Sequence, residues 1–195
     1  MKKLIVALFI VASVSGTAAA IEFNPFSFPP PIEEGSFLID AGLGFVWTGW
    51  SQGSLSVPPL FLHAEYALPV GFPISVGAGF AFFQWRYSTY VPLESESGWI
   101  RNVFDIFARA NWHFGLDIDW LDLYTGISLG ARIINTTPRG GWDGAAAPNR
   151  FLFNWQLGAR FFNLPFLPED LSNHLGFIIQ IGFPYVIKAG VSFRF

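Results

Sequence analysis

The sequence contains no cysteine and few charged residues. Without cysteine the chain forms no disulfide, carries no lipid on an N-terminal cysteine and offers no thiolate ligand to a metal. Charged residues make up 13% of the chain, hydrophobic residues 52% and aromatic residues 18%. Soluble domains usually contain about 25% charged residues. The composition therefore argues against an ordinary soluble domain.

Long hydrophobic runs are scarce, and the one at the N-terminus is short. Residues 4–12 are apolar, follow Lys2 and Lys3, and precede a stretch of small residues that ends at Ala20. This pattern predicts a cleavable signal peptide over residues 1–20, whereas the alternative, an anchor helix, needs about 20 apolar residues. Cleavage leaves nine basic and fourteen acidic residues, a net charge of −5. That balance argues against nucleic acid as a partner.

The rest of the chain has the pattern of a membrane β-barrel. After residue 20 no apolar run is long enough for a spanning helix, and a closed β-barrel is the other structure that lipid permits. Residues 21–35 are rich in proline and predict an extended leader on the periplasmic side. Residues 36–195 predict an all-β, eight-stranded antiparallel up-and-down transmembrane barrel. We expect its strands near residues 36–48, 60–68, 74–86, 102–114, 121–134, 150–162, 174–183 and 185–195.

Side chains in these segments alternate between two faces of different character. One face is apolar and aromatic without charge, as in Phe37, Ile39, Leu43 and Phe45 of the first segment. The opposite face carries the charged residues Asp40, His63, Glu65, Asp105, Arg109, Asp122, Arg132, Arg160, Lys188 and Arg194 and the polar residues Asn111, His113, Asn154, Gln156 and Gln180. A soluble lipocalin-like barrel would have its apolar face inside. The pattern predicts lipid outside and a charged interior.

The connections between the segments predict the orientation of the barrel. Three connections are long and polar or rich in glycine and proline, while PVGFP and GLDIDW between them are short. Barrels whose termini are both periplasmic have long extracellular loops and short periplasmic turns. Trp50, Trp99 and Trp142 fall in the long connections, beyond the expected lipid belt. They predict either contact with an extracellular ligand or packing among the loops.

The C-terminal segment, YVIKAGVSFRF, ends on an aromatic residue after alternating apolar positions. Val191, Phe193 and Phe195 resemble the assembly signal of bacterial outer-membrane barrels, which the barrel-assembly machinery reads. In size the chain is similar to the eight-stranded group that includes the OmpA membrane domain, OmpX and OmpW. The resemblance is architectural and covers residues 36–195. It implies a bacterial outer-membrane location, with outer-membrane lipid and the barrel-assembly machinery as partners.

The inward charges predict either a structural network or the lining of a pore. Eight strands enclose a space that side chains are able to fill, and buried charges need partners. Glu65 and Arg109 flank a strand whose inward residues are small (Ser75, Gly77, Gly79 and Ala81), so we expect them to pair across it. A functional version of this pair is a gate in which Lys188 or Asp40 exchanges partners with it.

Catalytic and metal sites are not indicated. His63, His113 and His174 stand on different predicted strands, without a His or Glu at ligand spacing. No His lies two residues from a Ser on an outward face, so we expect neither an enzyme nor a cofactor or metal. Two functions remain open. One is a narrow passive channel for small apolar solutes, as the similarity to OmpW-like barrels implies. The other is a structural or adhesin-like surface protein whose lumen is closed by paired charges.

Overall fold

The computed structural model describes residues 23–45, 53–89, 97–140, 147–183 and 187–195. The predicted signal peptide (residues 1–20), Trp50 and Trp142 lie outside these ranges. The elements are β1 (Phe23–Asn24), β2 (Phe37–Phe45), β3 (Ser54–Ala67), β4 (Ile74–Thr89), β5 (Ser97–Leu116), β6 (Leu121–Arg139), β7 (Arg150–Phe161), α2 (Glu169–Ser172), β8 (Leu175–Phe183) and β9 (Ile187–Arg194). Among the described residues, no helix is long and apolar enough to cross a membrane.

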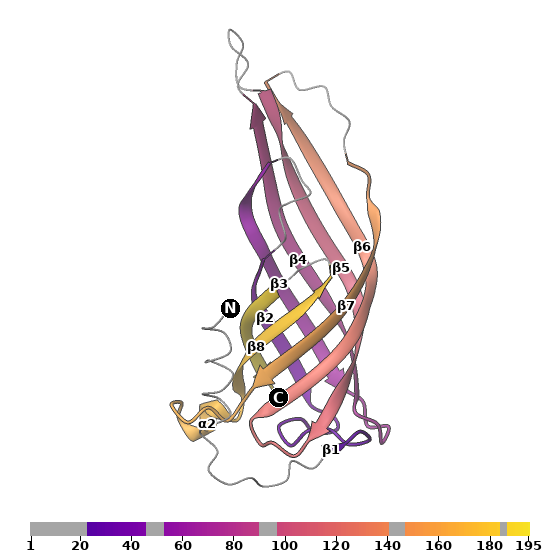
Figure 1. The fold of residues 1–195 in the computed structure, drawn as a ribbon, viewed down its shortest axis with the longest axis vertical. Helices are drawn as coiled ribbons and strands as arrows, with labels where there is room; N and C mark the ends of the chain where they lie inside the picture. The colour runs from indigo at the N-terminus through magenta and orange to yellow at the C-terminus, as the bar shows by residue number, and fades with distance from the viewer. Residues whose placement is uncertain (1–22, 46–52, 90–96, 141–146, 184–186) are drawn as a thin grey trace, which may run out of the picture.

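Strands β2 to β9 form a closed antiparallel barrel (Figure 1). Each strand pairs with the next along the chain, and β2 pairs with β9 from Leu38 opposite Arg194 to Phe45 opposite Ile187. This last pairing joins the two ends of the sheet and closes the barrel. The prediction of an all-β, eight-stranded up-and-down barrel is confirmed.

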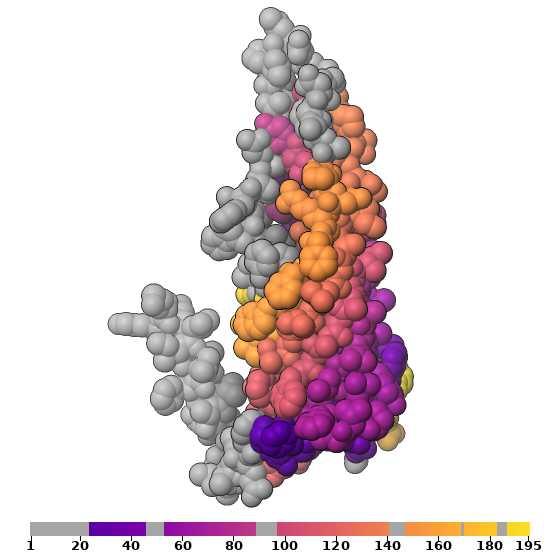
Figure 2. All heavy atoms as spheres, turned by 90° about the vertical axis from the view of Figure 1, so that its right-hand side faces the viewer, coloured from indigo at the N-terminus to yellow at the C-terminus, as the bar shows by residue number. Residues whose placement is uncertain are grey.

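The barrel wall is much taller on one side than on the other. Strand β5 has 20 residues and β6 has 19, whereas β2 has 9 and β9 has 8. Figure 1 shows β4, β5 and β6 rising far above β2 and β8, and in Figure 2 the wall that faces the viewer runs almost the full length of the molecule. We call the end where β4–β6 project the upper end.

The predicted upper ends of these strands were wrong, because residues expected in loops continue the sheet. Pairing between β4 and β5 extends to Thr89 opposite Ser97, and β5 pairs with β6 as far as Gly98 opposite Arg139. Strand β3 starts at Ser54, with its register shifts between Leu55 and Leu60. The two prolines of β3 fall in that irregular stretch, where the absent N–H groups break fewer ladder bonds.

The two faces of the wall differ as the alternation predicts. Outward residues such as Ile106 (53% exposed) and Phe153 (51%) are apolar, whereas inward Glu65 (1%) and Arg160 (0%) are charged and buried. The apolar outer surface has an upper limit at one level of the sheet. Phe82, Phe104 and Ile133 form its last row on β4, β5 and β6, and the next outward row is a polar row of Gln84, Asn102 and Asn135.

Residues 23–35 close the lower end of the barrel, where Figure 2 shows them in indigo. They do not form the extended leader predicted from the prolines. β1 pairs with the end of β5, Phe23 opposite Leu116, and Ile32 is buried against Leu38 and Phe162. The prolines turn the segment back under the barrel, so that its apolar residues are covered.

Candidate functional site in the barrel interior

Arg160 on β7 lies at the centre of the barrel interior and binds three carboxylates. Its Nε and Nη2 donate to the two oxygens of Asp40 on β2, at 3.1 and 2.8 Å. Nη2 also donates to Glu65 Oε1 on β3 at 2.6 Å, and Nη1 donates to Asp122 Oδ2 on β6 at 2.8 Å. All four side chains are at most 1% exposed. A planar guanidinium with five N–H groups suits this multiple binding better than an ammonium group.

Arg109 on β5 provides a second guanidinium to the same site. Its Nη2 lies 3.1 Å from Glu65 Oε1, across the small inward residues of β4. The structure thus brings Glu65 and Arg109 together at the place expected from the sequence. Glu65 and Asp40 both bind Arg160. The gate hypothesis instead named Lys188 or Asp40 as the group that exchanges partners with the pair of Glu65 and Arg109. We call Asp40, Glu65, Asp122, Arg109 and Arg160 the central cluster.

A chain of amide side chains leads into the central cluster from the far wall. Tyr124 O–H donates to Gln180 Oε1 at 3.2 Å, and Gln180 Nε2 donates to Gln156 Oε1 at 3.5 Å. Gln156 Nε2 then donates to Asn111 Oδ1 at 2.7 Å, and Asn111 Nδ2 donates to Glu65 Oε2 at 2.7 Å. Each group accepts from one neighbour and donates to the next, so the chain ends on the carboxylate of Glu65.

His113 on β5 connects Asp122 to Ser75. Its Nδ1 lies 2.7 Å from Asp122 Oδ1, and its Nε2 lies 2.9 Å from Ser75 Oγ on β4. Ser75 Oγ in turn donates to Glu65 Oε2 at 2.9 Å. His113, Ser75 and Asp122 are each 0% exposed. The ring of Phe28, from the segment under the barrel, packs on His113 with 5.4 Å between ring centroids.

A second layer of charges lies above the central cluster. Arg132 donates to both oxygens of Asp105 at 2.7 Å. His63 accepts from Arg109 at Nδ1 and packs between the rings of Phe61 and Phe107. The Nζ of Lys188 lies 5.5 and 5.8 Å from the centroids of these same two rings, so it is placed in the upper layer.

Apolar side chains cover the charged layers at both ends. The upper set extends from the tall wall down to the level of Arg160 and comprises Phe61, Ala81, Phe83, Trp85, Trp99, Val103, Tyr124 and Ile178. The lower set lies under the central cluster and comprises Ile32, Leu38, Ala67 and Phe162, with Phe28 packed against it. Buried charged and apolar side chains therefore lie inside the barrel at the level of the central cluster, below it and above it.

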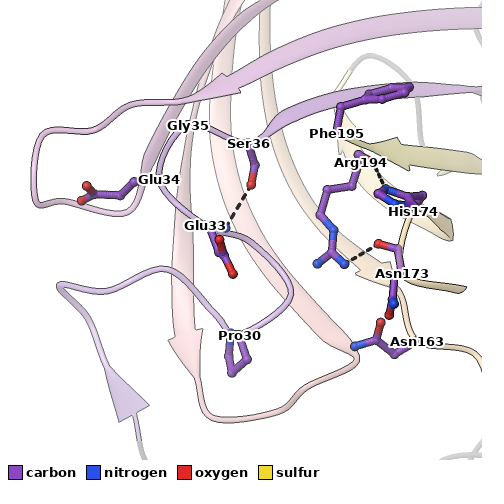
Figure 3. A pocket seen from close by; sticks show the side chains of 10 residues that line it. All are labelled: Pro30, Glu33, Glu34, Gly35, Ser36, Asn163, Asn173, His174, Arg194 and Phe195. Atoms are coloured by element: carbon purple, nitrogen blue, oxygen red, sulfur yellow. Dashed lines mark hydrogen bonds between the residues drawn. The ribbon is translucent and has the colours of Figure 1, made fainter. Parts of the chain in front are cut away.

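Arg194, predicted as part of the interior network, instead lies at the lower rim. Its guanidinium donates to the backbone oxygens of Pro31 and Asn173 and lies over the ring of Phe162. It lines a pocket of about 440 Å³ together with His174 and Glu33, and Figure 3 shows it pointing toward Asn173. Because it binds residues 23–35 to the turn before β8, its role here is to hold the lower closure in place.

Trp99, predicted in an outer loop, lies in β5 and is buried in the upper apolar set. Its ring stacks on Tyr87 at 5.8 Å, and Arg101 lies 4.2 Å above its centroid. The long pairing of β4 with β5 places it there, which the polar sequence around it did not indicate.

The three residues of the proposed assembly signal lie on the outer face of β9 or just after it. Phe193 is 38% exposed and Phe195 is 68% exposed, whereas Val191 is half-buried. Phe195 also exchanges two backbone hydrogen bonds with Phe37, at 2.9 and 3.0 Å. The C-terminal residue therefore belongs to the seam that closes the barrel.

Two interior residues were not predicted as part of the site. Tyr124 alternates in phase with Asp122, so the period of two along β6 was the signal for its inward position. Ser75 was read only as a small residue that leaves space, and its hydroxyl group becomes important only beside His113. Among the described residues no group of three or more His, Asp or Glu side chains is arranged to hold a metal ion.

Comparisons with known proteins leave the chain without a family. No family model matches it, and no curated protein matches it. Among solved structures, the crystal structure of Ail, the attachment invasion locus protein of Yersinia pestis, is similar with a TM-score of 0.46 and 12% identity. The match covers 84% of this chain and 100% of that chain. At this level of similarity, no conclusion about function follows from it.

Proposed function

We propose that the protein is a bacterial outer-membrane β-barrel with a closed lumen, acting as a structural or surface-interaction protein and not as an enzyme. Support for the membrane comes from the outer surface. On β5 the outward apolar face runs from Phe104 to Phe114, close to the roughly 9 to 11 residues that a tilted strand needs to span the bilayer. The predicted export signal and the terminal Phe195 point to the outer membrane and to the barrel-assembly machinery.

The observation that carries the closed lumen is the binding of three carboxylates by Arg160. Passage of a solute would require that Asp40, Glu65 and Asp122 separate from this guanidinium. A buried ion pair that loses one partner is destabilised by about 3 to 5 kcal/mol. Apolar layers above and below the cluster add further barriers. This arrangement favours the closed barrel over a passive channel for small apolar solutes.

The interaction surface of this proposal is the tall wall above the polar row of Gln84, Asn102 and Asn135. With that row at the membrane boundary, the upper parts of β3–β6 stand outside the bilayer. Tyr87 and Arg101, both half-buried, pack on the buried ring of Trp99 there, and tyrosine and arginine side chains are enriched where proteins bind partners. The predicted ligand contact of Trp50 and Trp142, which lie outside the described residues, remains a prediction.

Planar-bilayer recording and liposome swelling test the closed lumen. We expect the purified barrel to show no steady single-channel conductance and no sugar-driven swelling, with a general porin as the positive control in the same lipid. The variant Arg160→Ala removes the central guanidinium. It tests whether the interior opens when the central cluster is broken. Steady conductance of the unaltered protein, or its uptake of small apolar solutes into liposomes, would establish the channel alternative.

A further inference from the structure

The hydrogen bonds around His113 determine how many protons its ring carries. Glu65 accepts from Arg160 and Asn111 and is ion-paired with Arg109, so it is an ionised carboxylate that accepts without donating. The Ser75 hydroxyl, 2.9 Å from Glu65 Oε2, must therefore donate its single proton there. With that proton used, the 2.9 Å contact between Ser75 Oγ and His113 Nε2 requires a proton on Nε2.

The other ring nitrogen of His113 carries a proton for the same reason. Its Nδ1 lies 2.7 Å from Asp122 Oδ1, and Asp122 accepts from Arg160 through its second oxygen at 2.8 Å. A carboxylate held by a guanidinium is ionised and accepts, so Nδ1 donates to it. Both nitrogens of His113 are thus donors, and only the imidazolium form has two N–H groups.

We propose that His113 is a buried imidazolium, and that the closed interior of the barrel depends on the proton it holds. The inference deepens the closed lumen proposed above and rests on it for its functional meaning. The central cluster contains three carboxylates and two guanidiniums. A charged His113, bonded to one of these carboxylates and joined to another through Ser75, supplies the remaining positive charge.

Charged and polar groups reach His113 from every side of the lower interior. Ser75 faces it from β4, Asp122 and Tyr124 from β6, and the ring of Phe28 from below. Beyond these lie Glu65 on β3, Arg109 on β5, and Arg160 on β7, which carries Asp40 of β2. Lys188 and the pair of Asp105 with Arg132 belong to the layer above. Each group in direct contact with His113 either favours the charged form of its ring or carries no charge itself.

Ser75, His113 and Asp122 have the spacing of a nucleophilic serine site, yet the proton directions are reversed. In such a site the serine donates to a neutral histidine, which then acts as the base. Here Ser75 donates to Glu65 and accepts from His113, so no base is left to activate the hydroxyl. The arrangement stores a proton, and it does not generate a nucleophile.

His63 provides an internal control, because its environment requires the opposite state. Its Nδ1 accepts a hydrogen bond from Arg109, so that nitrogen has no proton. Among the described residues its Nε2 has no hydrogen-bond partner, and aromatic rings pack on both sides. A charged ring there would place its Nδ1 proton against the Arg109 guanidinium, while Asp40 Oδ2 lies 4.0 Å from that nitrogen, beyond hydrogen-bond distance. The two buried histidines of one interior are therefore assigned different charges.

Nitrogen-15 NMR of histidine side chains tests this assignment directly on the barrel in detergent micelles. The ring nitrogens of His113 should both show the shifts of protonated nitrogen at about pH 7, while His63 shows one protonated and one bare nitrogen. The variants His113→Gln, His63→Gln and His174→Gln assign the signals. A neutral His113 ring at about pH 7 overturns the proposal, whether or not the lumen conducts.

Unfolding of matched variants at one pH measures what the charged ring contributes. His113→Gln keeps a hydrogen-bond donor but removes the positive charge between Asp122 and Ser75, so we expect it to lower the thermal midpoint clearly at about pH 7. His63→Gln, which removes a ring assigned as neutral, should lower the midpoint less. Equal losses for the two variants would show that the charge of His113 has no role in closure. Conductance recorded on the same samples tests the lumen separately.

Discussion

Arg160 is the residue on which the interior depends most, because one side chain neutralises groups from three strands. Asp40, Glu65 and Asp122 come from β2, β3 and β6 and meet only at this guanidinium. Arg109, the other guanidinium of the central cluster, forms an ion pair with Glu65. The two arginines are equally inaccessible, so they form a matched pair for measuring how charge is shared in the lumen.

We predict that Arg160→Ala lowers the free energy of unfolding by about 3 to 5 kcal/mol, because buried carboxylates lose their partner. Arg109→Ala should cost less, since Glu65 keeps Arg160. Arg160→Lys should fall between them, because an ammonium group keeps the charge without the planar donor set. Urea unfolding in lipid vesicles, followed by circular dichroism, gives the three values. Equal costs for the two alanine variants would contradict the central position of Arg160.

Among the elements, β9 combines the end of the chain with the closure of the barrel. Its outward residues Ile187 and Phe193 face away from the interior, and its backbone pairs with β2 along the whole of its length. The two backbone hydrogen bonds between Phe195 and Phe37 extend this seam by one further pair. The terminal residue thus has a structural contribution from its backbone that is separate from any contribution of its ring.

We predict that deleting Phe195 reduces the amount of folded barrel in the outer membrane, since both the ring and the last backbone pair of the seam are lost. Phe195→Ala, the matched control, keeps the backbone pair and removes only the ring. Membrane levels and heat-dependent gel mobility of the two variants separate these contributions. Similar defects in both would assign the effect to the aromatic ring, as recognition by the assembly machinery requires. Normal levels of the deletion variant would refute the assembly signal.

For the whole molecule, the level at which the outer face changes from apolar to polar defines its position in the bilayer. On β5 this change falls between Phe104 and Asn102, and it occurs at the same row on β4 and β6. The strands continue well beyond it, so with the proposed outer-membrane placement the tall wall stands outside the bilayer. Ala108, near the middle of the apolar face, and Ile100, beyond its upper limit, lie on the same face of β5.

We predict that Ala108→Arg destabilises the barrel folded in lipid vesicles by about 2 to 4 kcal/mol, the cost of a lipid-facing arginine near the bilayer centre. Ile100→Arg should change this stability by less than about 1 kcal/mol, although Arg86 lies opposite, because exposed charges in water interact weakly. The measurement is urea-dependent folding into vesicles for both variants. Equal costs at the two positions would show that the bilayer boundary does not lie at the Gln84, Asn102 and Asn135 row.

The sequence by itself determined the class of fold, the number of strands and the face on which each side chain lies. These properties depend on a period of two and on the incompatibility of unpaired backbone with lipid, and both are local or general. The pairing of Glu65 with Arg109 was also accessible, because both flank one strand whose inward residues are small. The upper ends of the strands could not be predicted from the sequence. Ser, Gly and Pro have little preference for strands, and they form them here only through pairing with a neighbouring strand.

Only the tertiary structure decided which inward charges meet and how the interior is closed. Arg160 and Asp40 are separated by 120 positions in the chain. Their contact depends on the closure of the barrel and on the tilt of its strands, and no local sequence pattern determines either property. The same holds for the residues under the barrel, where Ile32 reaches Phe162, and for the protons of the interior. The charge of His113 follows from the directions of hydrogen bonds that four strands bring together, because a hydroxyl group has one proton and Glu65 accepts it.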